Sequence, residues 1–220
     1  MTGNPPHVFV VDDDPHVLTA LERLLRVHGF AVEVFTSAKT FLERPPIEAP
    51  AVLLLDLRMP GLSGLDVQQA LQRRGLDMPI VFLSGESDVP STARAMREGA
   101  IDFLVKPVAA DELLEAVERA AHRATDLRQQ QEAARHAERL IARLTKRERE
   151  VCELVARGLL NKQIAYELGT SEKTVKVHRG RVMHKLEVNS VAALVQLLSR
   201  QPLHQARPLD ERVSDGHSAR

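Results

Sequence analysis

The sequence predicts an α/β domain with a doubly wound, five-stranded parallel sheet, followed by a small all-α domain that contains a helix-turn-helix. Three observations support this. The first half alternates strand-like and helix-like segments, the second half consists of short helical segments, and the charge changes sign between them. Residues 1–122 contain 11 Lys and Arg against 18 Asp and Glu, a net charge of −7, whereas residues 143–200 contain 12 against 6, a net charge of +6. This asymmetry indicates two domains with different partners.

Composition and cysteine usage narrow the class of protein. A chain of 220 residues that is 44% hydrophobic can bury one or two cores. Its longest apolar runs are too short to span a membrane, and its first residues lack the pattern of a signal peptide, so we expect a cytoplasmic protein with no membrane partner. The single cysteine, Cys152, excludes an internal disulfide and a cysteine metal cluster, and we interpret it as core filling.

Five short strands are expected in the first half. They contain β-branched and apolar residues with little polar alternation, which is typical of parallel strands covered on both faces. Between the first two strands, the amphipathic stretch 16–29 predicts a helix that ends at Gly29. Strands that alternate with helices require right-handed crossovers and give a doubly wound sheet. The expected strands are residues 8–11, 31–35, 51–56, 79–84 and 102–106.

Four of these strands end in residues that can bind or transfer charge. Asp12 and Asp13 follow the first strand, and Asp56, Ser84 and Lys106 end three others. In an open parallel sheet, ligands bind outside the carboxyl ends of the strands, so one pocket can contain all five residues. Clustered carboxylates repel one another at neutral pH unless a cation lies between them. Oxygen ligands of this kind suit Mg²⁺.

Each of these residues also has an ordinary structural explanation. The acidic pair could only end a strand, and the serine and the lysine could be a turn residue and a solvated side chain. Asp14 before Pro15 does have such a role in our interpretation, as the N-cap of a helix with proline at its first position. Taken one residue at a time, these structural explanations suffice. Together they do not explain why the side chains gather at the one edge where this architecture forms a site, so we favour a magnesium site.

The motifs "VVDDDP", "LLLDLRMPGLSG", "VFLSGE" and "DFLVKP" occur in this order within residues 7–120. This combination resembles the receiver domains of bacterial two-component response regulators, which have a flavodoxin-like fold. The resemblance implies that Asp56 is the phosphoacceptor. It also implies that Asp13, the Asp56 carboxylate and the backbone carbonyl of Arg58 bind Mg²⁺, with Asp12 helping through water.

The same resemblance implies a switch beside the phosphoacceptor. Ser84 would meet a phosphoryl oxygen after transfer, Lys106 would pair with its charge, and Phe103 would change rotamer. The peptide bond before Pro107 is expected to be cis. The phosphodonor implied by the family is a phosphohistidine on a sensor histidine kinase.

The second half predicts a helix-turn-helix. In "NKQIAYELG" we expect Asn161 to be the N-cap and Gly169 to form the turn. A longer basic helix should follow the cap residue Ser171 and run from about Glu172 to Leu186. Alternatively, the segment is a small helical bundle with solvated lysines, but the crowding of positive charge into one helix favours phosphate contact.

The segment "LTKREREVCELVARGLLNKQIAYELGTSEKTVKVHRGRVMHKL" is similar to the LuxR-type DNA-binding domain, and with the receiver motifs the whole chain looks like a NarL/FixJ-type response regulator. In that family, the positions of Lys176 and Val177 touch base edges. Some relatives have a basic residue where this chain has Gly180, which leaves open whether a neighbouring arginine reads bases. The expected DNA contacts are Lys173, Thr174, Lys176, Val177, His178, Arg179, Arg181 and Lys185.

We therefore expect a receiver domain at 1–122, a helical linker at 123–142, a DNA-binding domain at 143–200 and a disordered tail at 201–220. The expected function is phosphorylation-controlled transcription regulation, with Mg²⁺ as cofactor. The expected partners are a sensor histidine kinase, double-stranded DNA, a second copy of the chain and RNA polymerase.

Two other functions remain as alternatives to this one. The first is a DNA-binding regulator that does not depend on phosphorylation. The second is a magnesium-dependent phosphatase or phosphotransferase, which ranks lower because Leu57 and Arg58 follow Asp56 with no second carboxylate two residues on. We therefore do not expect an enzyme.

Overall fold

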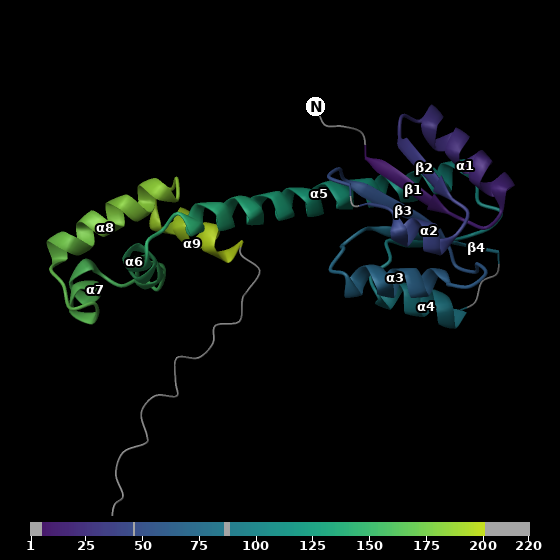
Figure 1. Ribbon diagram of the computed structural model, residues 1–220. Coiled ribbons are helices and arrows are strands. Elements are labelled where there is room, and N and C mark those ends of the chain that lie inside the picture. The colour runs from purple at the N-terminus through teal and green to yellow at the C-terminus, as the bar shows by residue number, and fades with distance from the viewer. Residues whose placement is uncertain (1–5, 46, 86–88, 201–220) are drawn as a thin grey trace, which may run out of the picture. The chain divides into compact units, whose positions relative to one another are not determined.

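The structure is a computed structural model that describes residues 6–45, 47–85 and 89–200 (Figure 1). The expected tail, 201–220, lies outside the described residues. The chain divides into two compact units, residues 1–129 and 130–220. Among the described residues, none of the helices has both the length and the hydropathy that a membrane span needs.

The first unit is built on a parallel sheet with the strand order β2-β1-β3-β4-β5. This order confirms the doubly wound sheet, and each strand lies within one or two residues of its predicted position. The strands are β1 (His7–Val11), β2 (Ala31–Phe35), β3 (Ala51–Asp56), β4 (Ile80–Ser84) and β5 (Asp102–Val105). The helices that begin in this unit are α1 (Pro15–Val27), α2 (Ala38–Glu43), α3 (Gly64–Arg73), α4 (Val89–Arg97) and α5 (Ala110–Ala142), of which α5 crosses the boundary between the units.

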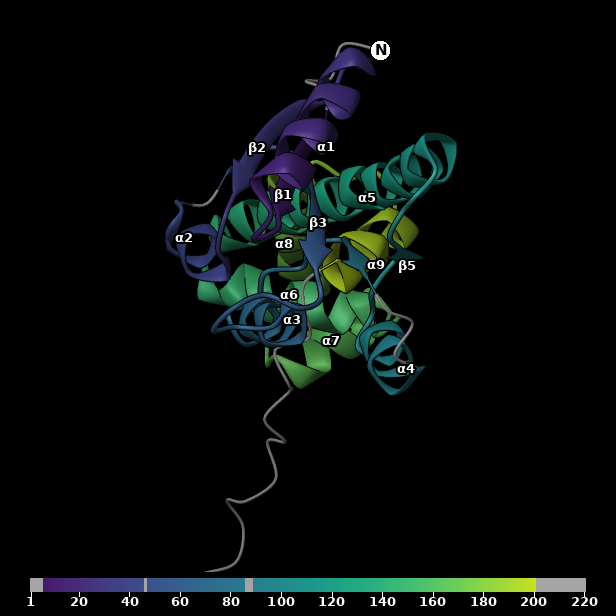
Figure 2. The same cartoon turned by 90° about the vertical axis from the view of Figure 1, so that its right-hand side faces the viewer.

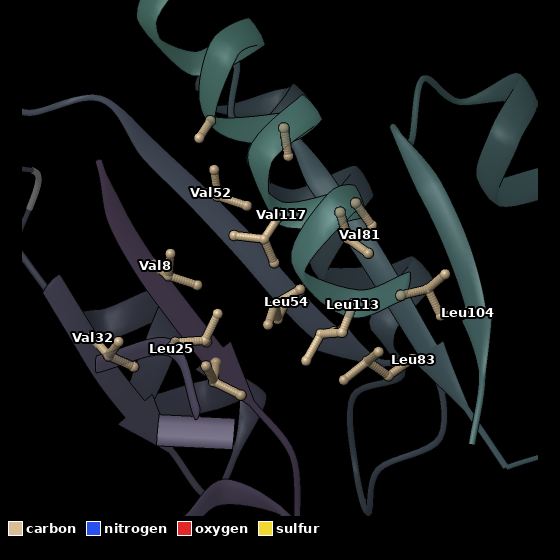
Figure 3. Packing of buried hydrophobic residues seen from close by; sticks show 14 of the residues in the cluster. Val8, Leu25, Val32, Val52, Leu54, Val81, Leu83, Leu104, Leu113 and Val117 are labelled. Carbon is tan, nitrogen blue, oxygen red and sulfur yellow. The ribbon is translucent and has the colours of Figure 1, made fainter. Parts of the chain in front are cut away.

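Helices cover the sheet on both faces (Figures 1 and 2). On one face, apolar residues of α1 and α5 pack on the sheet, and Figure 3 shows Leu113 and Val117 of α5 over Leu54 and Leu83. On the other face, α2, α3 and α4 contribute a second cluster that includes Phe41. Because both faces are covered, all six residues of β3 are buried, which explains its run of apolar residues before Asp56.

The ends of α1 follow the sequence prediction. The Asp14 carboxylate accepts a hydrogen bond from the His16 amide at 2.8 Å, and Pro15 is the first helical residue. Gly29 follows the C-cap with a φ of +86°, a conformation that glycine adopts without a steric cost. The predicted N-cap and the predicted end of this helix are thus confirmed. The N-cap holds the chain in place directly after Asp12 and Asp13.

The start of α3 packs directly against the end of β3. The amide of Gly64 donates a hydrogen bond to the Leu57 carbonyl at 2.9 Å. A Cβ at Gly64 would lie 2.6 Å from the Asp56 carbonyl oxygen and 2.9 Å from the Phe82 ring. Only glycine therefore allows α3 to approach the strand that ends in Asp56.

Glutamine side chains connect α3 to the last turn of α4. The Gln68 side chain, which is buried, donates hydrogen bonds to the Ala95 and Glu98 carbonyls at 3.2 and 3.1 Å. Gln72 donates to the same Glu98 carbonyl at 2.7 Å. The Ala95 carbonyl also accepts a hydrogen bond from the Ala100 amide at 3.0 Å, so the glutamines add side-chain hydrogen bonds to the carbonyls at the end of α4.

Up to residue 200, where the description of the second unit ends, four further helices follow, α6 (Lys146–Ala156), α7 (Asn161–Glu167), α8 (Glu172–Lys185) and α9 (Val191–Ser199). Their apolar faces form one core that includes the buried Cys152, which confirms its interpretation as core filling. The turn between α7 and α8 contains Gly169 with a φ of +59°, and the Ser171 side chain caps α8. The predicted helix-turn-helix is therefore present.

The prediction that Asn161 caps α7 is wrong. Leu160 occupies the N-cap position, and the Gln163 side chain accepts a hydrogen bond from its amide at 2.8 Å. Asn161 is instead the first residue of the helix, and its side-chain oxygen accepts a hydrogen bond from Arg179 at 2.8 Å. The asparagine therefore serves a contact between two helices rather than a helix end.

Candidate functional site

The carboxyl edge of the sheet brings the predicted acidic residues together. Val11 lies opposite Leu55 in the parallel register of β1 and β3, so Asp12 and Asp56 follow at adjacent strand ends. Asp12 is 1% exposed and Asp56 is 5% exposed, whereas Asp13 is exposed to solvent. Two carboxylates that are this deeply buried need a partner, because an isolated buried charge is strongly destabilising.

Lys106 provides that partner. Its ammonium lies 2.5 Å from Oδ2 of Asp12 and 2.9 Å from Oδ1 of Asp56. Lys106 directly follows β5, and its amide donates a hydrogen bond at 2.7 Å to the carbonyl of Ser84, the last residue of β4, which holds the chain in this position. Lys106 thus connects the ends of β1, β3 and β4. Of these strands, only β4 is a neighbour of β5, which Lys106 follows.

The charges in this cluster shift one another's protonation. Burial raises the pKa of Asp56 above its usual value, although Lys106 opposes this rise through a hydrogen bond and its charge. Burial alone would lower the pKa of Lys106, but the hydrogen bonds to Asp12 and Asp56 outweigh it, and the pKa lies above its usual value. At neutral pH the lysine is therefore positively charged, and it favours the ionised form of Asp56.

The acidic residues fit a divalent cation of the hard, oxygen-preferring kind. Carboxylate oxygens of Asp12, Asp13 and Asp56 all lie within 4.8 Å of one another. Asp13 faces solvent, so an ion bound here can keep some of its water, as Mg²⁺ does in proteins. Receiver domains bind Mg²⁺ at an acidic cluster of this kind, and the donor set of this chain suits that ion.

The remaining predicted residues of this unit lie around the same edge. Ser84 is buried at the end of β4. Phe103 lies opposite Phe82 in the register of β4 and β5, with 6.4 Å between the ring centroids, and it is half-buried. The Lys106–Pro107 peptide bond is cis, as predicted.

In the second unit, α8 carries the predicted basic face. Val175 and Val182 are buried, as expected for the side that packs on the core. Lys173, Lys176 and Arg181 are exposed, and Val177 is 47% exposed despite its apolar side chain. Thr174 and His178 are half-buried.

Two of the predicted DNA contacts already have partners within the protein. Arg179 donates from Nη1 to Asn161, which connects α8 to the start of α7. Lys185 lies 2.6 Å from Glu148 of α6, whose side chain is 4% exposed. The Glu148 side chain also accepts a hydrogen bond from the Thr145 amide at 2.9 Å, within the capping box of α6.

Sequence reasoning missed Glu148. The hydrogen bond from Lys185, with those from Thr145, lowers the pKa of Glu148 to about 2, so this carboxylate is ionised throughout the physiological range. The pattern Thr145–x–x–Glu148 is a capping-box signature and could have placed the glutamate at the start of a helix. Its lysine partner, 37 residues later, leaves no mark in local sequence.

A parallel sheet with carboxylates and a lysine at its carboxyl edge, joined to a helix-turn-helix unit with a basic second helix, defines a transcription regulator that receives a signal in one domain and binds DNA with the other. Comparison with protein families agrees with this class. Residues 8–118 match the response regulator receiver domain, and residues 142–198 match the bacterial regulatory proteins of the luxR family. The chain belongs to the NarL/FixJ-type response regulators.

Individual relatives match over nearly the whole chain. Nodulation protein W of Bradyrhizobium diazoefficiens is 44% identical over 190 residues, which cover 86% of this chain and 84% of the relative. Response regulator protein TodT of Pseudomonas putida is 43% identical over 200 residues, which cover 91% and 88%. The solved structure of response regulator StyR is 48% identical and superposes with a TM-score of 0.78 over 89% of this chain and 99% of that one.

Proposed function

We propose that Asp56 is the phosphoacceptor of this response regulator and that its phosphorylation by a sensor histidine kinase controls DNA binding by α8. The observation that supports the first part is the position of Asp56, a buried carboxylate that is paired with Lys106 beside Asp12. A carboxylate can attack phosphorus when positive groups neutralise the incoming phosphoryl charge. The acidic and basic residues at this edge are of the types that such a transfer needs.

The chemistry assigns a role to each residue. An oxygen of Asp56 attacks the phosphorus of a phosphohistidine, a P–O bond forms, and the P–N bond breaks as the imidazole leaves. Lys106 pairs with the transferred group, and the Ser84 hydroxyl donates to one of its oxygens. Asp12, Asp13, the Asp56 carboxylate and the Arg58 carbonyl would hold Mg²⁺, which supplies positive charge and orients the phosphoryl oxygens.

The first experiment tests the phosphoacceptor. Incubation of the full chain with acetyl phosphate and Mg²⁺ should add one phosphoryl group, seen by intact mass, and Asp56→Asn should abolish the addition because the amide is not a nucleophile of this kind. Asp77→Asn, at an exposed aspartate before β4, is the matched control and should be labelled normally. Labelling of Asp56→Asn at the level of the unaltered chain would refute the assignment.

Phosphorylation should change how the chain behaves in solution. Recruitment of the Ser84 hydroxyl would open space for the Phe103 ring on the adjacent strand, and the face beyond Phe103 would change shape. We expect this change either to expose a surface for homodimer formation or to release residues 143–200 from the receiver, through the linker at 123–142. Sedimentation and DNA-binding curves should therefore differ with and without acetyl phosphate. Identical curves would remove the switch.

We further propose that the exposed side of α8 enters the major groove of DNA. Lys176 is placed to reach base edges and Val177 to meet a thymine methyl, while Lys173 and Arg181 contact phosphates. Arg179 and Lys185 have protein partners, so we assign them to positioning α8. A DNA-bound dimer would work in the cytoplasm and present a surface to RNA polymerase.

One lysine variant and one arginine variant distinguish base reading from phosphate contact. Lys176→Ala should cost about 1–3 kcal/mol on a selected duplex and reduce its advantage over random DNA. Arg181→Ala should weaken both duplexes alike and lower the slope of log affinity against log salt by about one. Binding curves at several salt concentrations measure both effects. If Arg181→Ala collapses the specificity and Lys176→Ala does not, the arginine beside Gly180 reads the bases.

A further inference from the structure

Gly180 is a glycine that neither the backbone nor the core of the second unit explains. It lies inside α8, eight residues after the helix begins, and it is absent from the positive-φ positions at which glycine is needed. A glycine inside a helix costs about 1 kcal/mol relative to alanine. Gly180 therefore makes α8 less stable than an alanine at this position would.

Packing within the protein does not require the glycine either. A Cβ at Gly180 would meet no atom within 4 Å among the residues that the structure describes. This contrasts with Gly64, where a Cβ would lie 2.6 Å from the Asp56 carbonyl oxygen. A side chain at Gly180 would thus project into open space, and the reason for its absence has to be sought outside this chain.

The surroundings of Gly180 indicate what lies outside. Residues 173, 176, 177, 180 and 184 follow the helical spacing i, i+3, i+4, i+7 and i+11, so they share one face of α8. We call this face the outer stripe, and all its members, Lys173, Lys176, Val177, Gly180 and His184, are exposed. The buried Val175 and Val182 lie on the other side of the helix.

The outer stripe has long cationic side chains toward the start of α8 and none at its centre. Lys173 and Lys176 come before Gly180, and the exposed Arg181 flanks it. A partner that satisfies these charges is a polyanion, and it can approach the helix backbone most closely where no side chain stands in between. Double-stranded DNA has both properties, because its phosphates flank a groove whose floor carries the base edges.

We propose that Gly180 is the point at which the backbone of α8 comes closest to the floor of the DNA major groove, so that the missing side chain determines affinity and base specificity. This inference rests on the proposed entry of α8 into the major groove. It assigns to Gly180 a specificity role that depends on the space it leaves free. A methyl group added there would push α8 away from the bases that Lys176 and Val177 reach.

The test uses two variants, each of which should stabilise the fold but weaken DNA binding. Gly180→Ala and Gly180→Leu should both raise the thermal unfolding midpoint of the full chain, since alanine and leucine favour helix and meet open space. Both should weaken binding to a duplex selected from a random library by the unaltered chain, by about tenfold for alanine and more for leucine. Binding to random-sequence duplex should fall less, so the specificity ratio decreases.

Ala142→Leu, at an exposed alanine in the last turn of α5, adds bulk to a helix without touching the outer stripe and should leave DNA binding unchanged. If Gly180→Ala binds the selected duplex as tightly as the unaltered chain, or if it lowers the unfolding midpoint, the inference is wrong. If the unaltered chain itself does not prefer the selected duplex, the proposed DNA contacts of α8 fail before this inference is reached.

Discussion

Replacing Lys185 with methionine should lower the free energy of unfolding of the DNA-binding unit by about 2–3 kcal/mol. The Lys185 ammonium lies 2.6 Å from Glu148, whose side chain is 4% exposed. Removing the cation leaves a buried carboxylate without its main partner, which is the costly way to break an ion pair. The expected loss is below that for a fully buried pair because a third of the Lys185 side chain is exposed.

The pH dependence identifies the carboxylate that is responsible. The pKa of Glu148 is lowered to about 2 from an ordinary value of 4.5, so its contribution to stability is complete above about pH 4.5 and is lost as the pH falls through 2. Lys185→Met moves the pKa of Glu148 back toward its ordinary value. Denaturation curves should therefore show the full difference between the two proteins at pH 7 and a smaller one as the pH falls from 4.5 to 2.

Lys173→Met is the matched control, since it removes an exposed lysine from the same helix and should change stability little. A Lys185→Met variant as stable as this control at pH 7 would show that the ion pair contributes nothing measurable. A difference that stays constant down to pH 2 would assign the loss to packing of the lysine stem rather than to Glu148.

Lys106→Met should have a similarly large effect on the receiver unit, and Mg²⁺ should partly reverse it. Without the ammonium, Asp12 and Asp56 face each other as buried like charges, and we expect a loss of about 2–3 kcal/mol in the absence of metal. A divalent cation bound by Asp12, Asp13 and Asp56 would supply the missing positive charge. The stabilisation by Mg²⁺ should thus be larger for the variant than for the unaltered chain.

Denaturation with EDTA and with excess Mg²⁺ measures this difference, with Lys39→Met, an exposed lysine on α2, as the control. The same variant should be phosphorylated more slowly by acetyl phosphate, because the transferred charge loses its lysine partner. Equal stabilisation of both proteins by Mg²⁺ would contradict the view that lysine and cation neutralise the same carboxylates.

Local sequence was sufficient to predict the sheet because its signals are local. The run "AVLLLD" gave β3 with its exact bounds, while β4 begins after Pro79, since proline has no amide hydrogen to donate to a neighbouring strand. The carboxyl edge also followed from the expected parallel direction of the strands, and it contains Asp12, Asp56 and Lys106 as expected. The sequence did not show that Lys106 pairs with Asp12 more closely than with Asp56.

Contacts between distant side chains were beyond local reasoning. The sequence pattern placed Arg179 and Lys185 among the expected DNA contacts, but it could not show that Asn161 and Glu148 lie within hydrogen-bond distance of them. The error at Asn161 has the same origin. Asparagine prefers the N-cap position, but a contact with another helix and the Gln163 side chain at Leu160 decided the outcome.

The glutamine hydrogen bonds between α3 and α4 determine which movements of α4 cost little free energy. Gln68 and Gln72 donate to carbonyls at Ala95 and Glu98, so they fasten the last turn of the helix. A displacement that preserves these bonds is a rotation of α4 about its C-terminal end. The largest excursion then falls on the first turn of α4, the end that follows Ser84 along the chain.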